Sequence, residues 1–369
     1  MKQIKRISII LVVLLALMGC TARDPEVDDE TPPDQQIVQT TREGDYEMAY
    51  PFTPSPLRQI RAIGSREVES HEIGRRLLDK SKRHFSVNSY YVSEGQMLDE
   101  DRYLDLLIFQ SEDNPDGLMT RYPEGLDIDG VTLINPVFVS DIFEYNFHRK
   151  NDENTIDGIS LAIVLKRYQV LDQNTGIMHA LSDDALYNIG QTIGLQLGAY
   201  MRSLEGVSNV PIYIGLYVQS SDIDRLPGNY LPGYFIGEAY SSDGSMSFSR
   251  NYEQWMLLSE ARAQSLLPEI VSQFNQLKQK VIHFTGDESV GLIGKVFIAD
   301  NNLEMIRLEV NVPSKTFLET YGLGQYLSHE IEGLASFDVS VKVNINVYDK
   351  TRGIIVKNPG SSPIFEIFE

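Results

Sequence analysis

The most regular pattern in the chain is a strict alternation of apolar and polar residues between Phe337 and Val347. Every second residue in this stretch is apolar, and the residues between them are charged or carry hydroxyl or amide groups. In an extended chain, a period of two places all the apolar side chains on one face. The stretch therefore predicts a strand with one buried face and one face in water.

A helical period runs through the middle of the chain, between Ser182 and Gly206. Ser182 or Asp183 is suited to cap this helix, and Gly206 is suited to end it. Apolar residues recur at steps of three and four, which gathers them in one stripe along a helix. The stripe consists of Leu186, Ile189, Ile193, Leu197, Tyr200 and Leu204.

Three glycines, Gly190, Gly194 and Gly198, occur at four-residue steps inside the same predicted helix. Each costs about 1 kcal/mol relative to alanine in a helix interior. Such a row favours a close neighbour, because a helix surface without side chains lets another element approach it. The expected neighbour is the sheet of the same domain, and the alternative is the same helix in a second copy of the chain.

The same order of elements occurs twice along the chain. Each series has a helix candidate upstream, then strands on both sides of a second helix, and Asp300-Asn301-Asn302 predicts a hairpin in the second series. The first series is the helix 67–83, the strand 158–170, the helix 182–206 and the strand 210–219, and the second is the helix 268–282, the hairpin 294–312, the helix 314–334 and the strand 336–348.

These elements predict the α+β class, with two tandem related domains. Each domain is expected to hold a mainly antiparallel sheet with helices packed on one side. The predicted domains span residues 58–247 and 248–369, with the division near Ser247–Glu253.

The first 19 residues have the three parts of a secretory signal: a cationic start, an apolar block over 9–17 and a small residue before a cysteine. The apolar block is too short to span a bilayer comfortably. Its end resembles the lipobox of bacterial lipoproteins, whose cysteine receives a diacylglycerol thioether and becomes the first residue of the mature protein. We expect this modification at Cys20; the alternative is a signal cleaved elsewhere, which leaves a free thiol. The lipobox residues are Leu17, Met18, Gly19 and Cys20.

An acidic segment follows, and we expect residues 20–57 to form a disordered tether after the lipidated cysteine. Residues 21–47 carry nine acids against two arginines, with three prolines and few large apolar side chains. Such a composition cannot bury enough surface to offset chain entropy. The folded body would therefore stand away from the outer face of the cell membrane, where the lipid holds the protein.

Net charge and cysteine content narrow the possible partners. The chain of 369 residues has a formal net charge of −20, and removal of the leader leaves 29 basic against 52 acidic residues, a net charge of −23. This sign argues against nucleic acid and against anionic lipid as partners of the body. Cys20 is the only cysteine, so disulfides cannot hold the fold.

No catalytic or metal-binding motif stands out in the sequence. The six histidines are scattered singly, and neither His71-Glu72 nor His329-Glu330 is followed by a second histidine at helical spacing. We therefore predict no catalytic residue, no metal site and no cofactor.

One stretch, LPGNYLPGYF at Leu226–Phe235, is a candidate ligand-binding loop. Pro-Gly pairs favour tight turns, which could hold aromatic side chains outward as anchors for a sugar or a peptide. The alternative is that these aromatic rings pack onto a sheet edge. The candidate residues are Tyr230, Tyr234 and Phe235.

Two helix-and-strand couplets carry a resemblance to a known family. They read YNIGQTIGLQLGAYMR…VPIYIGLYVQ over 187–219 and YGLGQYLSHEIEG…FDVSVKVNINVYD over 321–349. With the lipobox and the acidic tether, they resemble the CamS family, the sex-pheromone lipoprotein precursors of Gram-positive bacteria. The resemblance implies a surface lipoprotein whose signal peptide yields a short hydrophobic pheromone, here VLLALMG over 13–19. The alternative is an ordinary leader without this second role.

The expected function is therefore binding or scaffolding outside the cell. The expected partners are the membrane, through the N-terminal lipid, and an unidentified small ligand, peptide or protein. The rival hypothesis is an extracytoplasmic enzyme that acts on cell-wall glycan or peptide. Convergent carboxylates in a deep cleft would favour this hypothesis.

Overall fold

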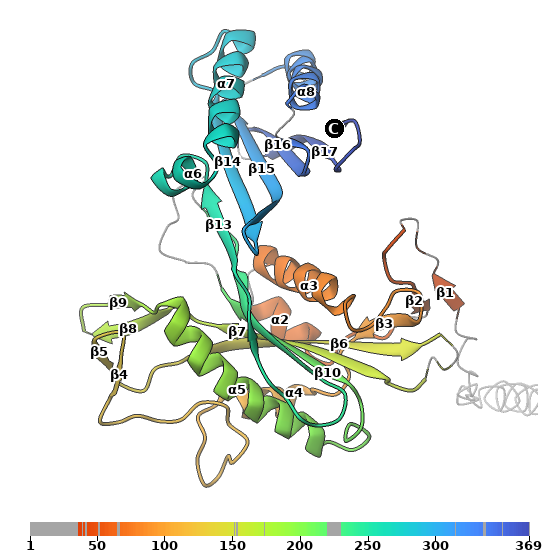
Figure 1. Cartoon of the computed structure of the whole chain (residues 1–369), viewed down its shortest axis with the longest axis vertical. Helices are drawn as coiled ribbons and strands as arrows, with labels where there is room; N and C mark the ends of the chain where they lie inside the picture. The colour runs from red at the N-terminus through yellow and green to blue at the C-terminus, as the bar shows by residue number, and fades with distance from the viewer. Residues whose placement is uncertain are drawn as a thin grey trace, which may run out of the picture.

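Two six-stranded sheets form the framework of the protein in the computed structural model (Figure 1). The structure describes residues 36–38, 40, 43–50, 52–64, 67–150, 152, 154–172, 174–219, 230–313, 315–334, 337–348 and 350–368. The predicted leader, the lipobox residues Leu17, Met18 and Gly19, and Cys20 lie outside these residues. No helix in the described part of the chain is both long enough and apolar enough to cross a bilayer.

Sheet 1 has the strand order β12-β11-β10-β7-β6-β3, and four helices surround it. Its strands are β3 (Tyr90–Glu94), β6 (Val139–Arg149), β7 (Gly158–Leu165), β10 (Ile212–Val218), β11 (Tyr234–Ser241) and β12 (Ser249–Arg250). Its helices are α2 (Arg58–Gly64), α3 (Glu67–Ser81), α4 (Glu100–Leu107) and α5 (Asp183–Ser203). Three small hairpins flank the sheet: β1 (Gln36–Val38) with β2 (Met48–Tyr50), β4 (Leu126–Ile128) with β5 (Val131–Leu133), and β8 (Tyr168–Asp172) with β9 (Ile177–Ala180).

Sheet 2 follows the chain order without a break, β13-β14-β15-β16-β17-β18. Its strands are β13 (Glu253–Leu257), β14 (Gly291–Ala299), β15 (Asn302–Val312), β16 (Ser340–Val347), β17 (Lys350–Lys357) and β18 (Ile364–Ile367). The helices of this domain are α6 (Ala261–Leu266), α7 (Pro268–Thr285) and α8 (Phe317–Glu332). The chain passes from sheet 1 to sheet 2 between Arg250 and Glu253.

The two domains share one topology, which confirms the predicted α+β class with two related halves. In each, an antiparallel pair is followed by a helix that crosses to a parallel strand, and further antiparallel strands complete the sheet. The series β3-α4-β6-β7-α5-β10-β11-β12 corresponds to β13-α7-β14-β15-α8-β16-β17-β18. One pair in each sheet is parallel, so both sheets are mainly antiparallel.

This correspondence corrects one detail of the sequence prediction. The predicted helix 67–83, which is α3, was taken as the counterpart of α7. In the structure the counterpart of α7 is α4, and α3 has no counterpart in the second domain. Helix α3 packs on the opposite face of sheet 1 from α4 and α5, so helices cover both faces there. The sequence of the central strands agrees with this two-sided cover. Every residue of β7 and β10 is buried, as expected for strands covered on both faces.

Sheet 2 has the one-sided burial that its alternating sequence predicts. In β16, Val341, Val343 and Ile345 are buried against α7 and α8, whereas Lys342 and Asn344 are exposed. The β14–β15 hairpin also forms as predicted, and both Asp300 and Asn301 have positive φ angles, 51° and 66°. Two successive positive φ angles are typical of the tight turn that matches the twist of antiparallel strands.

Local signals explain where α5 begins and why it carries glycines. Ser182 caps the helix, since its side chain accepts a hydrogen bond from the Ala185 backbone N–H at 3.2 Å. The glycine row packs within its own domain: Gly190 faces Leu165 and Leu216 of the sheet, and Gly194 faces the ring of Phe248. The neighbour is therefore the protein's own sheet and the connection between β11 and β12, as the first alternative predicted.

The predicted tether ends earlier than expected, because residues 43–50 belong to the folded body. The Tyr46 side chain is buried and its ring lies 5.3 Å from that of Phe147. Beside it, Asp45 pairs with Lys82 at 3.2 Å and Glu47 pairs with Lys150 at 2.6 Å. The buried ring and the ion pairs, together with a backbone hydrogen bond from Val92 of β3 to Glu47, fix a segment whose composition is otherwise typical of disorder.

We predict that two helix glycines respond oppositely to alanine. A Cβ at Gly194 would lie 2.2 Å from the Phe248 ring, whereas a Cβ at Gly322 in α8 would meet only one atom, at an ordinary 3.9 Å. Gly322→Ala should stabilise the protein by up to about 1 kcal/mol through helix propensity. Gly194→Ala should be destabilising overall, because overpacking costs about 1–3 kcal/mol. Urea unfolding of both variants checks this, and stabilisation by both would contradict the packing described for α5.

Candidate functional site

Helix α3 lies between the two sheets (Figure 1), where it packs on β6, β7 and β10 of sheet 1 and contacts β14 and β15 of sheet 2 through side chains. One side of the helix, with Ile73 and Leu77, packs into the apolar cluster on sheet 1. The other side meets the open face of sheet 2, where the Arg76 guanidinium lies 4.2 Å from the centre of the Phe297 ring. The helix thus forms the junction of the two domains.

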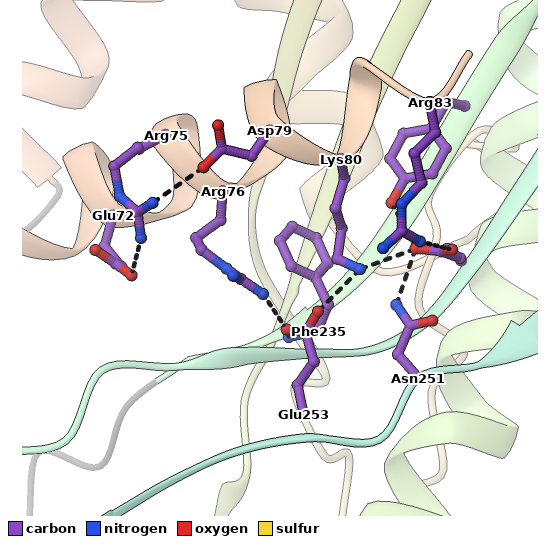
Figure 2. A network of polar contacts seen from close by, with 11 residues as sticks. Glu72, Arg75, Arg76, Asp79, Lys80, Arg83, Phe235, Asn251 and Glu253 are labelled. Carbon is purple, nitrogen blue, oxygen red and sulfur yellow. Dashed lines mark hydrogen bonds and ion pairs between the residues drawn. The ribbon is translucent and has the colours of Figure 1, made fainter. Parts of the chain in front are cut away.

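A chain of ion pairs runs along α3 to strands of both sheets (Figure 2). At its centre, Lys80 Nζ lies 3.0 Å from a Glu238 carboxylate oxygen on β11 and 2.9 Å from one of Glu253 on β13. The side chains of Lys80 and Glu253 are 7% and 5% exposed. One buried ammonium therefore holds a carboxylate from each domain.

Glu253 is bonded at both of its oxygens. The oxygen that does not face Lys80 pairs with Arg76 and accepts a hydrogen bond from the Phe235 backbone N–H at 3.0 Å. The Lys80 ammonium also lies 5.3 Å from the centre of the Phe235 ring. Figure 2 shows the two side chains next to each other. These contacts balance the desolvation of a carboxylate that leaves water.

Glu238 is held by four donors from different elements. Its oxygens accept from Lys80, from Asn251 at 2.9 Å, from the Tyr213 hydroxyl at 3.1 Å and from Arg83 at 3.2 Å. Burial by itself would raise the pKa of Glu238, but Lys80, Asn251 and Arg83 outweigh it and hold the pKa below its usual range. Burial, followed by the nearby Glu238 charge, raises the pKa of Tyr213 well above its ordinary value.

A third carboxylate, Glu72, completes the contact with sheet 2. It pairs with Arg75 of its own helix at 2.8 Å and with Arg307 of β15 at 2.9 Å. The Arg307 guanidinium in turn lies 4.6 Å from the centre of the Trp255 ring. Burial opposes ionisation of Glu72, yet the two guanidiniums hold its pKa below the usual range. All three junction carboxylates are thus matched by cations, which suits a structural role better than proton transfer.

A groove on domain 1 is the second feature with functional potential. It lies between α5 and the segment 118–138, on the side of sheet 1 away from α3, and encloses about 280 Å³. Its buried lining residues are Leu118, Met119, Phe138 and Ile193. Its polar lining residues are Thr120, Tyr122, Asp127, Asn188, Thr192 and Gln196.

The three aromatic residues predicted to bind a ligand do not share one surface. Phe235 is fully buried beneath α3, with its ring 5.2 Å from that of Tyr217, so it cannot be an outward anchor. Tyr234 is half-buried on the other side of β11, and its hydroxyl bonds to Arg167 and Asp183. Tyr230 is partly buried, and the Lys295 ammonium of sheet 2 lies 5.9 Å from its ring centre. Alternation along β11 explains why Tyr234 and Phe235 point to opposite faces.

The junction residues were missed by the sequence prediction, although two of them left a signal. Glu238 interrupts the apolar run of β11, YFIGEAYS, and Glu253 precedes the apolar residues of β13. A charge inside a buried strand calls for a partner, but the sequence does not say that Lys80, 158 residues from Glu238, supplies it. Among the described residues, no group of three or more histidine, cysteine or acidic side chains could hold a metal ion.

We predict that Glu253→Ala destabilises the protein by about 3–5 kcal/mol, because Lys80 and Arg76 lose a buried carboxylate that nothing replaces. Asp79→Asn on the exposed side of the same helix, which removes ion pairs with Arg75 and Lys82, is the control and should cost no more than about 1 kcal/mol. Urea unfolding followed by circular dichroism measures both losses. Equal small losses would show that the junction is no more than a surface contact.

Solved structures of other proteins have a fold similar to that of this chain. The crystal structure of a sex pheromone precursor from Lactobacillus salivarius subsp. salivarius UCC118 is similar with a TM-score of 0.77 at 19% identity, covering 91% of this chain and 99% of that chain. The C-terminal domain of the sex pheromone staph-cAM373 precursor from Staphylococcus aureus is similar with a TM-score of 0.65 at 18% identity, covering 82% and 96%. At these identities the likeness shows a shared fold. A search of curated protein sequences found no match.

The family comparison reaches further than the structural one. The family described as CamS sex pheromone cAM373 precursor matches residues 57–363, which include sheet 1, sheet 2 as far as β17, the α3 junction and the groove beside α5. The match extends over most of the chain and agrees with the resemblance seen in the helix-and-strand couplets. The chain therefore belongs to the CamS sex pheromone cAM373 precursor family.

Proposed function

We propose that this protein is an exported lipoprotein whose body binds or scaffolds a partner at the outer face of the cell membrane, and whose leader also supplies a hydrophobic peptide. The anchor is proposed at Cys20, on the order Leu17-Met18-Gly19-Cys20 after an apolar block. Two acyl chains on one cysteine would hold the acidic body far more firmly than a single chain.

The observation that carries the binding role is the preformed groove beside α5, in a body whose junction carboxylates are all ion-paired. A glycosidase needs one carboxyl group that can donate a proton and a second that is free to attack or to activate water. Glu238 and Glu253 do converge, but they share Lys80, and Glu253 has both oxygens bonded. At the junction, this arrangement supports binding rather than the rival enzymatic hypothesis.

The peptide role is proposed from the family and from position. Relatives in the family are described as sex pheromone precursors, and in this chain VLLALMG over 13–19 directly precedes Cys20. Cleavage before a lipidated cysteine would separate this apolar segment from the body. That cleavage leaves residues 1–19 as one leader peptide, so release of VLLALMG also requires hydrolysis of the Val12–Val13 peptide bond.

We predict that Cys20→Ser abolishes both the lipidated body and the released peptide, because the leader is no longer cleaved before residue 20. In a Gram-positive host, the chain that retains Cys20 should incorporate labelled palmitate and sediment with membranes. Mass spectrometry of the medium should detect VLLALMG. The variant cannot form the thioether, so it should lose the label, leave the washed membrane fraction and release no VLLALMG. Persistent membrane attachment of the variant would contradict the lipid anchor. Absence of the peptide from the medium of cells that express the chain with Cys20 would contradict the peptide role alone.

A further inference from the structure

The groove beside α5 has an apolar floor and walls fixed before any ligand binds. Leu118, Met119 and Phe138 are each at most 5% exposed and form the floor with Ile193. One wall is α5, where Asn188, Thr192 and Gln196 recur at four-residue steps and therefore line one side of the helix. The other wall includes Thr120, Tyr122 and Asp127.

Hydrogen bonds pin the second wall at several points, so the groove is preorganised. The Leu118 N–H donates to Leu106 O at 3.0 Å, and the Tyr122 N–H donates to the Asn135 side chain at 2.8 Å. Asp129, in the turn between β4 and β5, accepts from the backbone N–H and the hydroxyl of Ser182, the cap of α5. A site whose walls are already ordered loses less entropy when a ligand binds.

The segment that supplies the second wall of the groove is strongly acidic, and its Asp127 lines the groove itself. We use the name acidic rim for Asp127 together with Asp116 and Glu124 of the same segment. The segment 99–129 has ten acidic and two basic residues, a net charge of −8 within a chain whose net charge is −20. Both bases are engaged: Arg102 pairs with Asp99 at 3.4 Å, and Arg121 lies 4.8 Å from the centre of the Phe109 ring. After burial, the charges of Asp116, Asp99 and Asp105 contribute to a raised pKa of Tyr200 on α5, with Arg102 opposing them. These charges therefore act on α5 at a residue one turn beyond Gln196, the last groove residue of that helix.

These properties select one class of occupant. An apolar floor takes an aliphatic or aromatic side chain, and amide and hydroxyl groups along α5 suit hydrogen bonds to a peptide backbone. A volume of about 280 Å³ holds one or two side chains, and an acidic rim attracts ammonium and guanidinium groups while it repels carboxylates and phosphates. We infer that the groove between α5 and the segment 118–138 binds a short cationic amphipathic peptide, with apolar side chains in the groove and lysine or arginine at the acidic rim.

This inference rests on the proposed binding role of the body and is independent of the lipid anchor. The test therefore uses the full-length chain with Cys20→Ser and a fluorescein-labelled synthetic hexapeptide, Lys-Leu-Leu-Lys-Lys-Leu. Two control peptides carry Glu in place of Lys or Ser in place of Leu. Fluorescence anisotropy should show saturable binding of the cationic amphipathic peptide, weakened by added salt, and at least tenfold weaker binding of both controls.

Variants of the protein test whether the peptide binds in the groove. Thr192→Trp fills the groove from an exposed position on α5 and should abolish binding. Neutralising the rim by Asp116→Asn, Glu124→Gln and Asp127→Asn together should weaken binding about tenfold. The matched control neutralises three exposed acids of domain 2, by Glu269→Gln, Glu288→Gln and Glu304→Gln, and should change affinity less than twofold. Circular dichroism confirms that each variant is folded.

The outcomes separate this inference from the wider proposal. Equal binding of the Glu peptide, blocked by Thr192→Trp, would overturn the cationic class and leave a binding groove. Equal weakening by the two charge variants would assign the effect to overall charge and would also overturn the site. No binding of any peptide would overturn the inference as well, whereas the membrane fractionation of Cys20→Ser would be unaffected.

Discussion

The architecture depends on one buried contact, the Lys80 ammonium held between Glu238 of the first domain and Glu253 of the second. A buried ion pair of this kind adds little net stability compared with apolar packing, but loss of one partner is costly. Its value is therefore specificity: only one arrangement of the two sheets brings both carboxylates to the same cation. Arg76 and the Glu72–Arg307 pair extend this requirement along α3, so the helix fixes the domains in one relative position.

Helix α3 is the element that turns two similar domains into one body. Each domain covers one face of its sheet with a pair of equivalent helices, α4 and α5 in the first and α7 and α8 in the second. The remaining faces differ, because sheet 1 presents an apolar surface to α3 while sheet 2 meets it with Arg307, Phe297 and Glu253. The junction is thus mainly apolar on the sheet 1 side of the helix, with Glu238 as the exception, and mainly ionic on the sheet 2 side. This arrangement leaves the groove beside α5 on the far side of sheet 1, free of the junction.

Patterns that span a few residues were predictable from the sequence, and contacts between distant residues were not. Alternation identified β16, and the Asp300-Asn301 turn identified the hairpin before it. A helix was correctly predicted at α3, but a sequence pattern does not say which face of a sheet a helix covers. The prediction therefore took α3 as the counterpart of α7, whereas the structural counterpart of α7 is α4. Phe235 shows the same limit, since Pro-Gly turn chemistry placed it outward while strand alternation buries it under α3. The junction joins residues more than 150 positions apart, and a single sequence gives no information on that pairing.

The distance between the two domains tests the central claim most directly. Cys20 is the only cysteine, so a full-length chain with Cys20→Ser, Glu205→Cys and Leu318→Cys carries one exposed label site on each domain. Pulsed electron paramagnetic resonance of spin labels at these sites measures the distribution of distances between them. A junction fixed by Lys80 gives one narrow distribution, which broadens in Lys80→Met because two facing carboxylates then repel each other. A broad distribution with Lys80 present, or no change on its replacement, would contradict the account.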